Sequence, residues 1–243
     1  ATKNKYKINK NFPTDLYYKY WLELGLKEDQ LIKNQNRDTL LSLNVFGLPT
    51  PWGYRYELLY DYNGSLWDIA TVEYMTHRPV YEDKKIIDII NFNHCIGVSV
   101  VGLERINTII NDEKLIWNID TIRPLIEFAK SVIKSSDEYD AVVLVQSFRA
   151  IHKIIADGNN YSNLNRKRKE GIRSFYREFF KKTKHIEIDL STFIGQLCDI
   201  NAKANPWYPE LLNSRSVVIN EFEQRKVAFE NDRSVKYRGV AQQ

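Results

Sequence analysis

Cysteine is nearly absent from this chain of 243 residues, which contains only Cys95 and Cys198. Two cysteines cannot build a disulfide framework, and we interpret both as thiols of the hydrophobic core. Histidine is almost as scarce, and no two histidines have the four-residue spacing that puts two zinc ligands on one helix face. The four are His77, His94, His152 and His185. We therefore predict no metal site and no cofactor.

The sequence also lacks the short motifs that mark common enzymes. It has no glycine-rich phosphate loop, no Gly-x-Ser-x-Gly elbow and no dinucleotide fingerprint. Its longest apolar run, residues 95–103, is far shorter than the ~20 residues of a membrane-spanning helix. The lysine-rich start, residues 1–10, is not followed by the apolar stretch of a signal peptide. We therefore expect a protein that is cytoplasmic at synthesis.

What the chain does have is the composition of a globular protein, with 43% hydrophobic and 27% charged residues. Its formal net charge is +4, which is too small to indicate a nucleic-acid-binding protein. Any electrostatic argument must therefore rest on how the charges cluster along the chain.

The pattern of residues predicts an α+β fold that is mainly helical, with a small antiparallel sheet near residues 53–103. Asn63-Gly64 is the strongest local signal, because both residues accept the positive φ angles of a two-residue hairpin turn. Residues 85–92 and 96–103 are expected to add strands. We predict an extended basic arm over residues 1–12 and a single domain over residues 13–243.

Helical patterns occupy most of the remaining chain, although 141–145, "AVVLV", also suits a strand. Asp120 is a candidate N-cap, and Gly158 suits a left-handed C-cap. The predicted helices cover residues 15–25, 27–47, 120–136, 137–158, 166–184, a stretch that begins at Ser191, and 216–232.

A dense basic cluster lies at residues 165–184, which contain nine Lys or Arg and two Glu. The apolar residues of this segment share one helical face, so the charges occupy the other: Ile172, Phe175, Tyr176 and Phe179. Clustered cations bind nucleic acids by displacing condensed counterions. Arg166, Lys167, Arg168 and Lys169 are therefore candidate DNA-facing residues, and a solvated helix face is the alternative.

A second candidate pattern is acidic. Asp68, followed by Glu82, Asp83 and Lys84, fits the loose arrangement of a metal-dependent nuclease. Two carboxylates would hold Mg²⁺ and a lysine would lie near the attacking water. Such a site requires these residues to meet on adjacent strands, and exposed hairpin charges are the alternative interpretation.

The segment 191–214 combines an apolar helical pattern with a proline corner. Phe193 and Leu197 belong to the apolar face, and Pro206 and Pro209 end the helix because proline fixes φ and removes an amide donor. The aromatic pair between the prolines, Trp207-Tyr208, needs a surface to pack on. The segment suits a docking or subunit-contact element, or an ordinary interhelical turn.

Parts of the basic segment 165–184 and of the segment 191–214 resemble lower collar proteins, the tail connectors of small podoviruses. The resemblance rests on "FYREFF" at 175–180, on Phe193 and Leu197, and on "NPWYPELL" at 205–212. Pro206, Trp207, Tyr208 and Leu211 match the family's Pro-Tyr-Tyr-x-x-Leu element in type. The matching positions all lie between residues 175 and 212.

The resemblance implies a virion structural protein of a bacteriophage tail that is not an enzyme, so the lack of catalytic motifs is expected. Lower collar proteins form a ring below the portal, extend the DNA channel and attach the distal tail. The expected partners are therefore other copies of this chain in a cyclic homo-oligomer, the portal protein and a distal tail or knob protein. Viral DNA is expected to pass through the ring non-specifically. No membrane is expected, and the location is the virion, with the host cytoplasm during assembly. The tail or subunit contact would use Phe193, Leu197, Pro206, Trp207, Tyr208 and Leu211. The alternatives are a Mg²⁺-dependent nuclease and a monomeric DNA-binding accessory protein.

Overall fold

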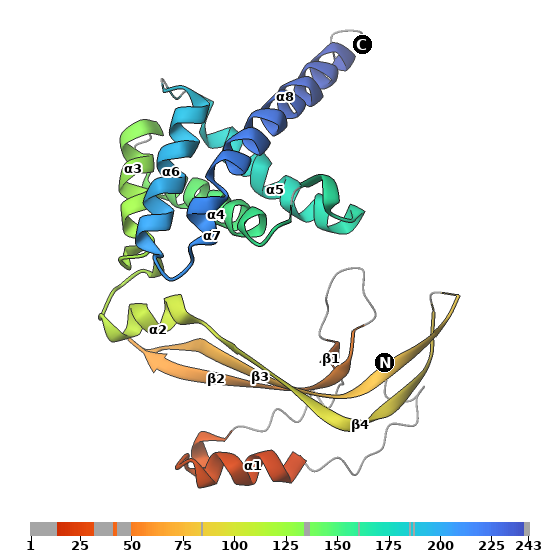
Figure 1. Cartoon of the computed structure of the whole chain (residues 1–243). Helices are drawn as coiled ribbons and strands as arrows, with labels where there is room; N and C mark the ends of the chain where they lie inside the picture. Colours follow the sequence, from red (N-terminus) through yellow and green to blue (C-terminus); the bar gives the residue numbers. More distant parts are fainter. Residues whose placement is uncertain are drawn as a thin grey trace. The chain divides into compact units, whose positions relative to one another are not determined.

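The computed structural model describes residues 14–31, 41–42, 50–83, 85–133, 137–159, 161–184, 186 and 188–240, with the backbone alone for 14–17, 41–42 and 232–240. It confirms an α+β fold that is mainly helical (Figure 1). The contacts within the chain divide it into two compact units, residues 1–103 and 104–243, which we describe separately. The division into an arm over 1–12 and one domain over 13–243 stays a prediction, and the arm lies outside the described residues.

The first unit begins with α1 (Thr14–Glu23), as predicted, and Gly25 follows it with a φ of +97°. The long helix predicted over residues 27–47 is wrong in the part that the structure describes. There the chain forms a 3-10 turn, η1 (Glu28–Gln30), and a two-residue strand, β1 (Leu41–Ser42). Strand β1 pairs with the next strand, so sheet pairing overrides the local helical preference.

The sheet is antiparallel with the strand order β1-β2-β3-β4 (Figure 1). The long strands are β2 (Trp52–Tyr62), β3 (Ser65–Glu82) and β4 (Lys85–Val101). The predicted hairpin is confirmed, because Asn63 and Gly64 have φ angles of 53° and 75° and Tyr62 pairs with Ser65 across the turn. The two strands predicted over 85–92 and 96–103 form the single strand β4.

Strand β4 is irregular in its middle. Met75 pairs with Ile96, but His77 pairs with Asn91, so residues 92–95 bulge out of the ladder. Cys95 lies in this bulge and is exposed, which corrects the expectation that both cysteines are core thiols. Cys198, in the second unit, is buried as predicted.

The second unit is helical. Its helices are α2 (Leu103–Ile110), which begins at the boundary, α3 (Arg123–Ile133), α4 (Glu138–Ala156), α5 (Arg166–Lys182), α6 (Leu190–Ala204), α7 (Glu210–Asn213) and α8 (Arg215–Val240), with 3-10 turns η3 (Ile116–Asn118) and η4 (Tyr161–Asn163). Residues 141–145 are helical, and Gly158 has the expected positive φ, 80°. The Asp120 cap is wrong, because α3 begins only at Arg123.

Aromatic rings from four helices form the centre of this unit. Phe179 of α5 packs against Phe222 of α8 with ring centroids 4.8 Å apart and against Phe193 of α6 at 6.2 Å. Phe148 of α4 lies 6.0 Å from Phe222. All four side chains are fully buried, and buried aromatics contribute large apolar area in defined geometries. This packing fixes how α5 presents its outer face.

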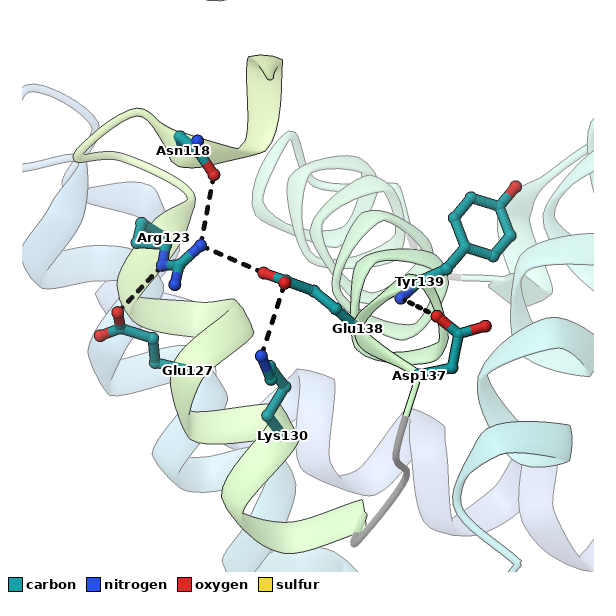
Figure 2. Close-up of polar contacts among 7 residues, drawn as sticks. All are labelled: Asn118, Arg123, Glu127, Lys130, Asp137, Glu138 and Tyr139. Atoms are coloured by element: carbon teal, nitrogen blue, oxygen red, sulfur yellow. Dashed lines mark hydrogen bonds and ion pairs between the residues drawn. The ribbon is translucent and has the colours of Figure 1, made fainter. Parts of the chain in front are cut away.

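Ion pairs connect α3 to α4 at the surface (Figure 2). Arg123 donates hydrogen bonds to Glu127, at 2.9 Å, and to Glu138, at 3.1 Å. Lys130 lies 3.5 Å from the other carboxylate oxygen of Glu138. Asp137 caps α4 by accepting from the amide of Tyr139. Two cations thus meet two carboxylates, and the network neutralises itself.

No helix among the described residues has the length and apolar character to cross a membrane.

Candidate nucleic-acid interface

The charge of this molecule is concentrated on one helix. Residues 165–184, which include α5, contain nine Lys or Arg and two Glu, for a net charge of +7. The whole chain has a formal charge of +4, so the rest of the chain is slightly negative overall. The positive charge of residues 165–184 therefore exceeds the net charge of the whole chain, and an extended anion would be attracted most strongly to this segment.

The first turn of α5 has an unusual electrostatic composition. Asn165 caps the helix, and its side chain accepts a hydrogen bond from the amide of Arg168 at 3.0 Å. The first four helical residues are all cationic, and the turn contains no acidic residue. The N-terminus of a helix carries a positive partial charge, so each cation there opposes the helix dipole by about 0.3–1 kcal/mol at low salt. Stability of the helix therefore does not explain why this turn is entirely cationic.

The buried face of α5 faces the core, as the sequence predicted. Ile172, Tyr176 and Phe179 are buried, and Phe175, predicted on the same face, lies at its edge and is partly exposed. A helical turn takes 3.6 residues, so residues 166, 173 and 177 lie within a narrow strip along the side of α5, about 95° around the helix from the centre of its buried face. All three are exposed arginines, and they extend along about 16 Å of the helix.

Most of the cations on α5 are not neutralised by a carboxylate. Arg166 pairs with Glu170 at 3.0 Å and Lys181 with Glu178 at 2.6 Å, both on the helix itself, and Lys182 pairs with Asp140 of α4. Exposed pairs of this kind contribute little to stability. Lys167, Arg168 and Arg177 form no ion pair with any residue that the structure describes. These three remain available to an external anion.

The run of charges in the sequence indicated Arg166, Lys167, Arg168 and Lys169 but not Arg173 and Arg177. Arg166, Lys167 and Arg168 are exposed, and Lys169 is partly covered. Arg166, Arg173 and Arg177 are related by spacings of seven and four residues. Those spacings place residues on one face of a helix, so the pattern was available in the sequence.

The proline corner after α6 contains the most exposed tryptophan among the described residues. Trp207 is 69% exposed, and Pro206 and Pro209 beside it are also exposed. Phe193, Leu197 and Leu211, named as contact residues from the resemblance, are buried instead. Their part in the fold is core packing, which leaves Pro206, Trp207 and the half-buried Tyr208 at the surface.

Tyr208 is held by two residues at the end of α4. Its hydroxyl donates a hydrogen bond to Asp157, and Lys153 Nζ lies 3.6 Å from the centre of its ring. Lys153 also pairs with Asp157 at 2.9 Å. The hydrogen bond from Tyr208, together with that from Lys153, lowers the pKa of Asp157 below its ordinary value. The corner that presents Trp207 is thus fixed by contacts with a distant part of the sequence.

The residues of the proposed nuclease pattern do not meet. Asp68 and Glu82 lie on the same strand, β3, and are separated by fourteen residues, on the order of 40 Å along an extended strand. Asp83 occupies the β3–β4 turn with a φ of 47°, and Lys84 lies outside the described residues. No group of three His, Cys, Asp or Glu side chains within the described ranges is arranged to hold a metal ion.

The histidines are as separate in space as they are in sequence. His77 is buried in β3, His94 is exposed in the β4 bulge, and His152 is buried in α4. His185 lies outside the described residues. Burial lowers the pKa of both His77 and His152, so both are neutral side chains at pH 7.

Comparison with known proteins gives a different relationship from the one suggested by the sequence motifs. No protein-family model matches this chain. Several curated proteins do resemble it. The chain is 24% identical over 254 residues to an alanine–tRNA ligase of Rickettsia canadensis (strain McKiel). This match covers 93% of the chain and 27% of that enzyme. Alanine–tRNA ligases of Rickettsia bellii (strain RML369-C) and Rickettsia rickettsii (strain Sheila Smith) match at 23% and 24% identity over 86% of the chain. The chain thus spans about a quarter of the length of these relatives.

The lower collar interpretation is therefore wrong. It rested on short segments between residues 175 and 212, whereas the similarity to alanine–tRNA ligases extends over most of the chain. The expectations that depended on it are corrected with it: a tail connector ring, the portal and knob partners, viral DNA as the passing ligand, and a location in the virion. The relatives support neither alternative, the Mg²⁺-dependent nuclease or the monomeric DNA-binding accessory protein.

Proposed function

We propose that this chain is a non-catalytic RNA-binding module that holds tRNA through the outer face of α5. The observation that carries the proposal is the charge of α5, which is net +7 over residues 165–184 of a chain that is otherwise slightly acidic. Phosphates are the polyanionic ligand that such a surface attracts, and cations bind them by releasing counterions. The relatives' name, alanine–tRNA ligase, supplies tRNA as the candidate polymer.

Two features of α5 support binding over a passive surface role. Four cations at the positive end of the helix dipole oppose helix stability, and a bound phosphate would reverse that effect. The arginine strip of residues 166, 173 and 177 repeats at intervals of about 6–10 Å, which is on the scale of neighbouring backbone phosphates. Contacts of this type position a nucleic acid and do not identify its bases.

The test is a measurement of tRNA affinity as a function of salt concentration. The test variant replaces Arg166, Lys167, Arg168 and Lys169 with Gln. A matched control replaces four exposed cations of the same unit that lie off α5: Arg105, Lys114, Lys203 and Lys226. Filter binding with unfractionated tRNA, and with duplex DNA of similar length as competitor, compares the wild type with both variants.

We expect the wild type to prefer tRNA, with log affinity falling linearly as log salt rises. The α5 variant should reduce that slope by about 2–4, because up to four phosphate contacts are lost, at roughly 0.7–0.9 each. The control variant removes the same charge and should change the slope by less than about 1. Equal slopes for the two variants, or no tRNA binding by the wild type, would refute the proposal.

A further inference from the structure

Tyr161, in the turn η4 before α5, is surrounded by cations. Arg173 Nε donates a hydrogen bond of 2.6 Å to its hydroxyl oxygen. The guanidinium carbon of Arg225, from α8, lies 4.1 Å from the centre of its ring, and Lys169 Nζ lies 5.6 Å from it. Helix α5, directly after this turn, and the distant helix α8 thus bring three positive side chains to one phenol ring.

The acidic residues around this cluster do not balance it. Glu221, one turn before Arg225 on α8, is the nearby carboxylate, and its Oε2 lies 3.8 Å from Arg225 Nε. That separation is an ion pair without a hydrogen bond, and both atoms are buried and lack a hydrogen-bond partner among the described residues. Glu170 of α5 is engaged with Arg166. Arg225 therefore has one carboxylate beside it, and neither Lys169 nor Arg173 forms an ion pair with a described residue.

Hydrogen bonds and a cation–ring contact position the members of this cluster. Lys169 Nζ donates to the carbonyl oxygen of Ser162 at 2.9 Å, and Arg173 is fixed through Nε. The terminal nitrogens of Arg173 form no hydrogen bond with another described residue. The guanidinium of Arg225 is held by its stacking on the Tyr161 ring. Arginines held in this way lose little side-chain entropy on binding, and their planar donor groups match the oxygens of a phosphate.

We infer that Lys169, Arg173 and Arg225 form a phosphate-binding site centred on Tyr161. Tyr161 contributes its ring and hydroxyl to orient the two guanidinium groups. The ligand is a phosphate group, either one phosphodiester of a bound RNA or a free phosphate ion. Where the ligand is RNA, the inference rests on the function proposed above. Arg173 belongs both to the arginine strip of α5 and to the cluster around Tyr161, so the RNA-binding surface would extend from α5 onto α8.

The experiment uses the full chain and two ligands. Isothermal titration with inorganic phosphate at constant ionic strength tests the site alone, and filter binding with unfractionated tRNA tests it within the RNA surface. The variants are Arg173→Gln and Arg225→Gln, and the control is Lys226→Gln, which removes an exposed charge from the residue next to Arg225. Circular dichroism verifies folding, and Arg173→Met with Arg225→Met, which keep a long side chain without the charge, replace the Gln variants if either fails to fold.

If the ligand is a phosphodiester of RNA, each test variant should weaken tRNA binding about tenfold or more and lower the salt slope by about 1. If it is free phosphate, the wild type should bind inorganic phosphate, the test variants should lose that binding, and tRNA affinity should hold within about twofold. Test variants that match Lys226→Gln with both ligands would overturn the site. Absence of tRNA binding in the wild type would refute the proposed function, and the phosphate titration would still decide the site.

Discussion

His152 Nε2 lies 2.9 Å from the carbonyl oxygen of Leu211, which is 59 residues further along the chain. The other ring nitrogen, Nδ1, lies 3.0 Å from the side-chain amide nitrogen of Asn201. Because that amide nitrogen can only donate, Nδ1 accepts and Nε2 carries the proton that bonds to Leu211. One fully buried imidazole therefore connects α4, α6 and α7.

Removing this imidazole should destabilise the helical unit. His152→Ala leaves a cavity and two buried polar groups without their partner, and we expect a loss of about 2–4 kcal/mol in the free energy of unfolding. Urea unfolding followed by far-ultraviolet circular dichroism measures it. The control is His94→Ala, at an exposed position, which should change stability by less than about 0.5 kcal/mol. Similar losses for both variants would contradict the connecting role of His152.

Acid should weaken the same connection. Burial is the main cause that lowers the pKa of His152, although its hydrogen bond to Leu211 opposes the shift. Below pH 6.5 the unfolded chain takes up a proton that the folded chain excludes, so stability is complete above that pH and falls as the pH decreases toward the folded pKa. The limiting slope is about 1.4 kcal/mol per pH unit for one histidine.

Urea midpoints between pH 5 and pH 8 would measure this dependence for the wild type and His152→Gln. Glutamine has no titrating group, so its profile should be flatter over this range even if the variant is less stable at every pH. Phe148, Asn201 and the Leu211 carbonyl are the groups in contact with the ring, and none of them is charged. Parallel profiles would assign the pH dependence to other residues.

The two cysteines should differ sharply in reactivity. Cys95 is exposed in the β4 bulge, and Cys198 is buried. Burial raises the pKa of the Cys198 thiol to about 12; the charge of Arg215 opposes this rise and that of Asp199 adds to it. The thiolate is the reactive form, so Cys198 should be inert in the folded protein. A colorimetric thiol reagent at pH 8 should modify one thiol per native chain and two in denaturant. Cys95→Ser should abolish the native reaction, and a persisting reaction would show that Cys198 is accessible.

Gly53 should not tolerate a side chain. A Cβ atom built there would lie 1.8 Å from the backbone carbonyl oxygen of Tyr74 on the paired strand, so Gly53→Ala forces the β2–β3 ladder apart. We expect a loss of more than about 3 kcal/mol in stability. Gly97→Ala is the matched control, because a Cβ at that position of β4 meets nothing within 4 Å. Thermal unfolding of both variants decides the matter, and equal melting temperatures would contradict the close approach.

Features that depend only on neighbouring residues could be predicted from the sequence. Asn63-Gly64 dictated the hairpin, because few other pairs accept positive φ at two successive positions. Gly158 marked the end of α4, and the apolar spacing of Ile172, Tyr176 and Phe179 predicted which face of α5 is buried. The basic outer face of that helix followed from the same periodicity.

Other features depend on contacts between residues far apart in the chain, and the sequence did not predict them. Pairing with β2 placed Leu41 and Ser42 in a strand despite a helical local pattern, and the bulge in β4 exposed Cys95. No spacing in the sequence indicates that Arg225 lies over Tyr161, because packing of α8 on α5 sets that contact. Local energies of about 1 kcal/mol per residue select helices and turns, but the collective burial of side chains from distant segments decides which polar groups meet.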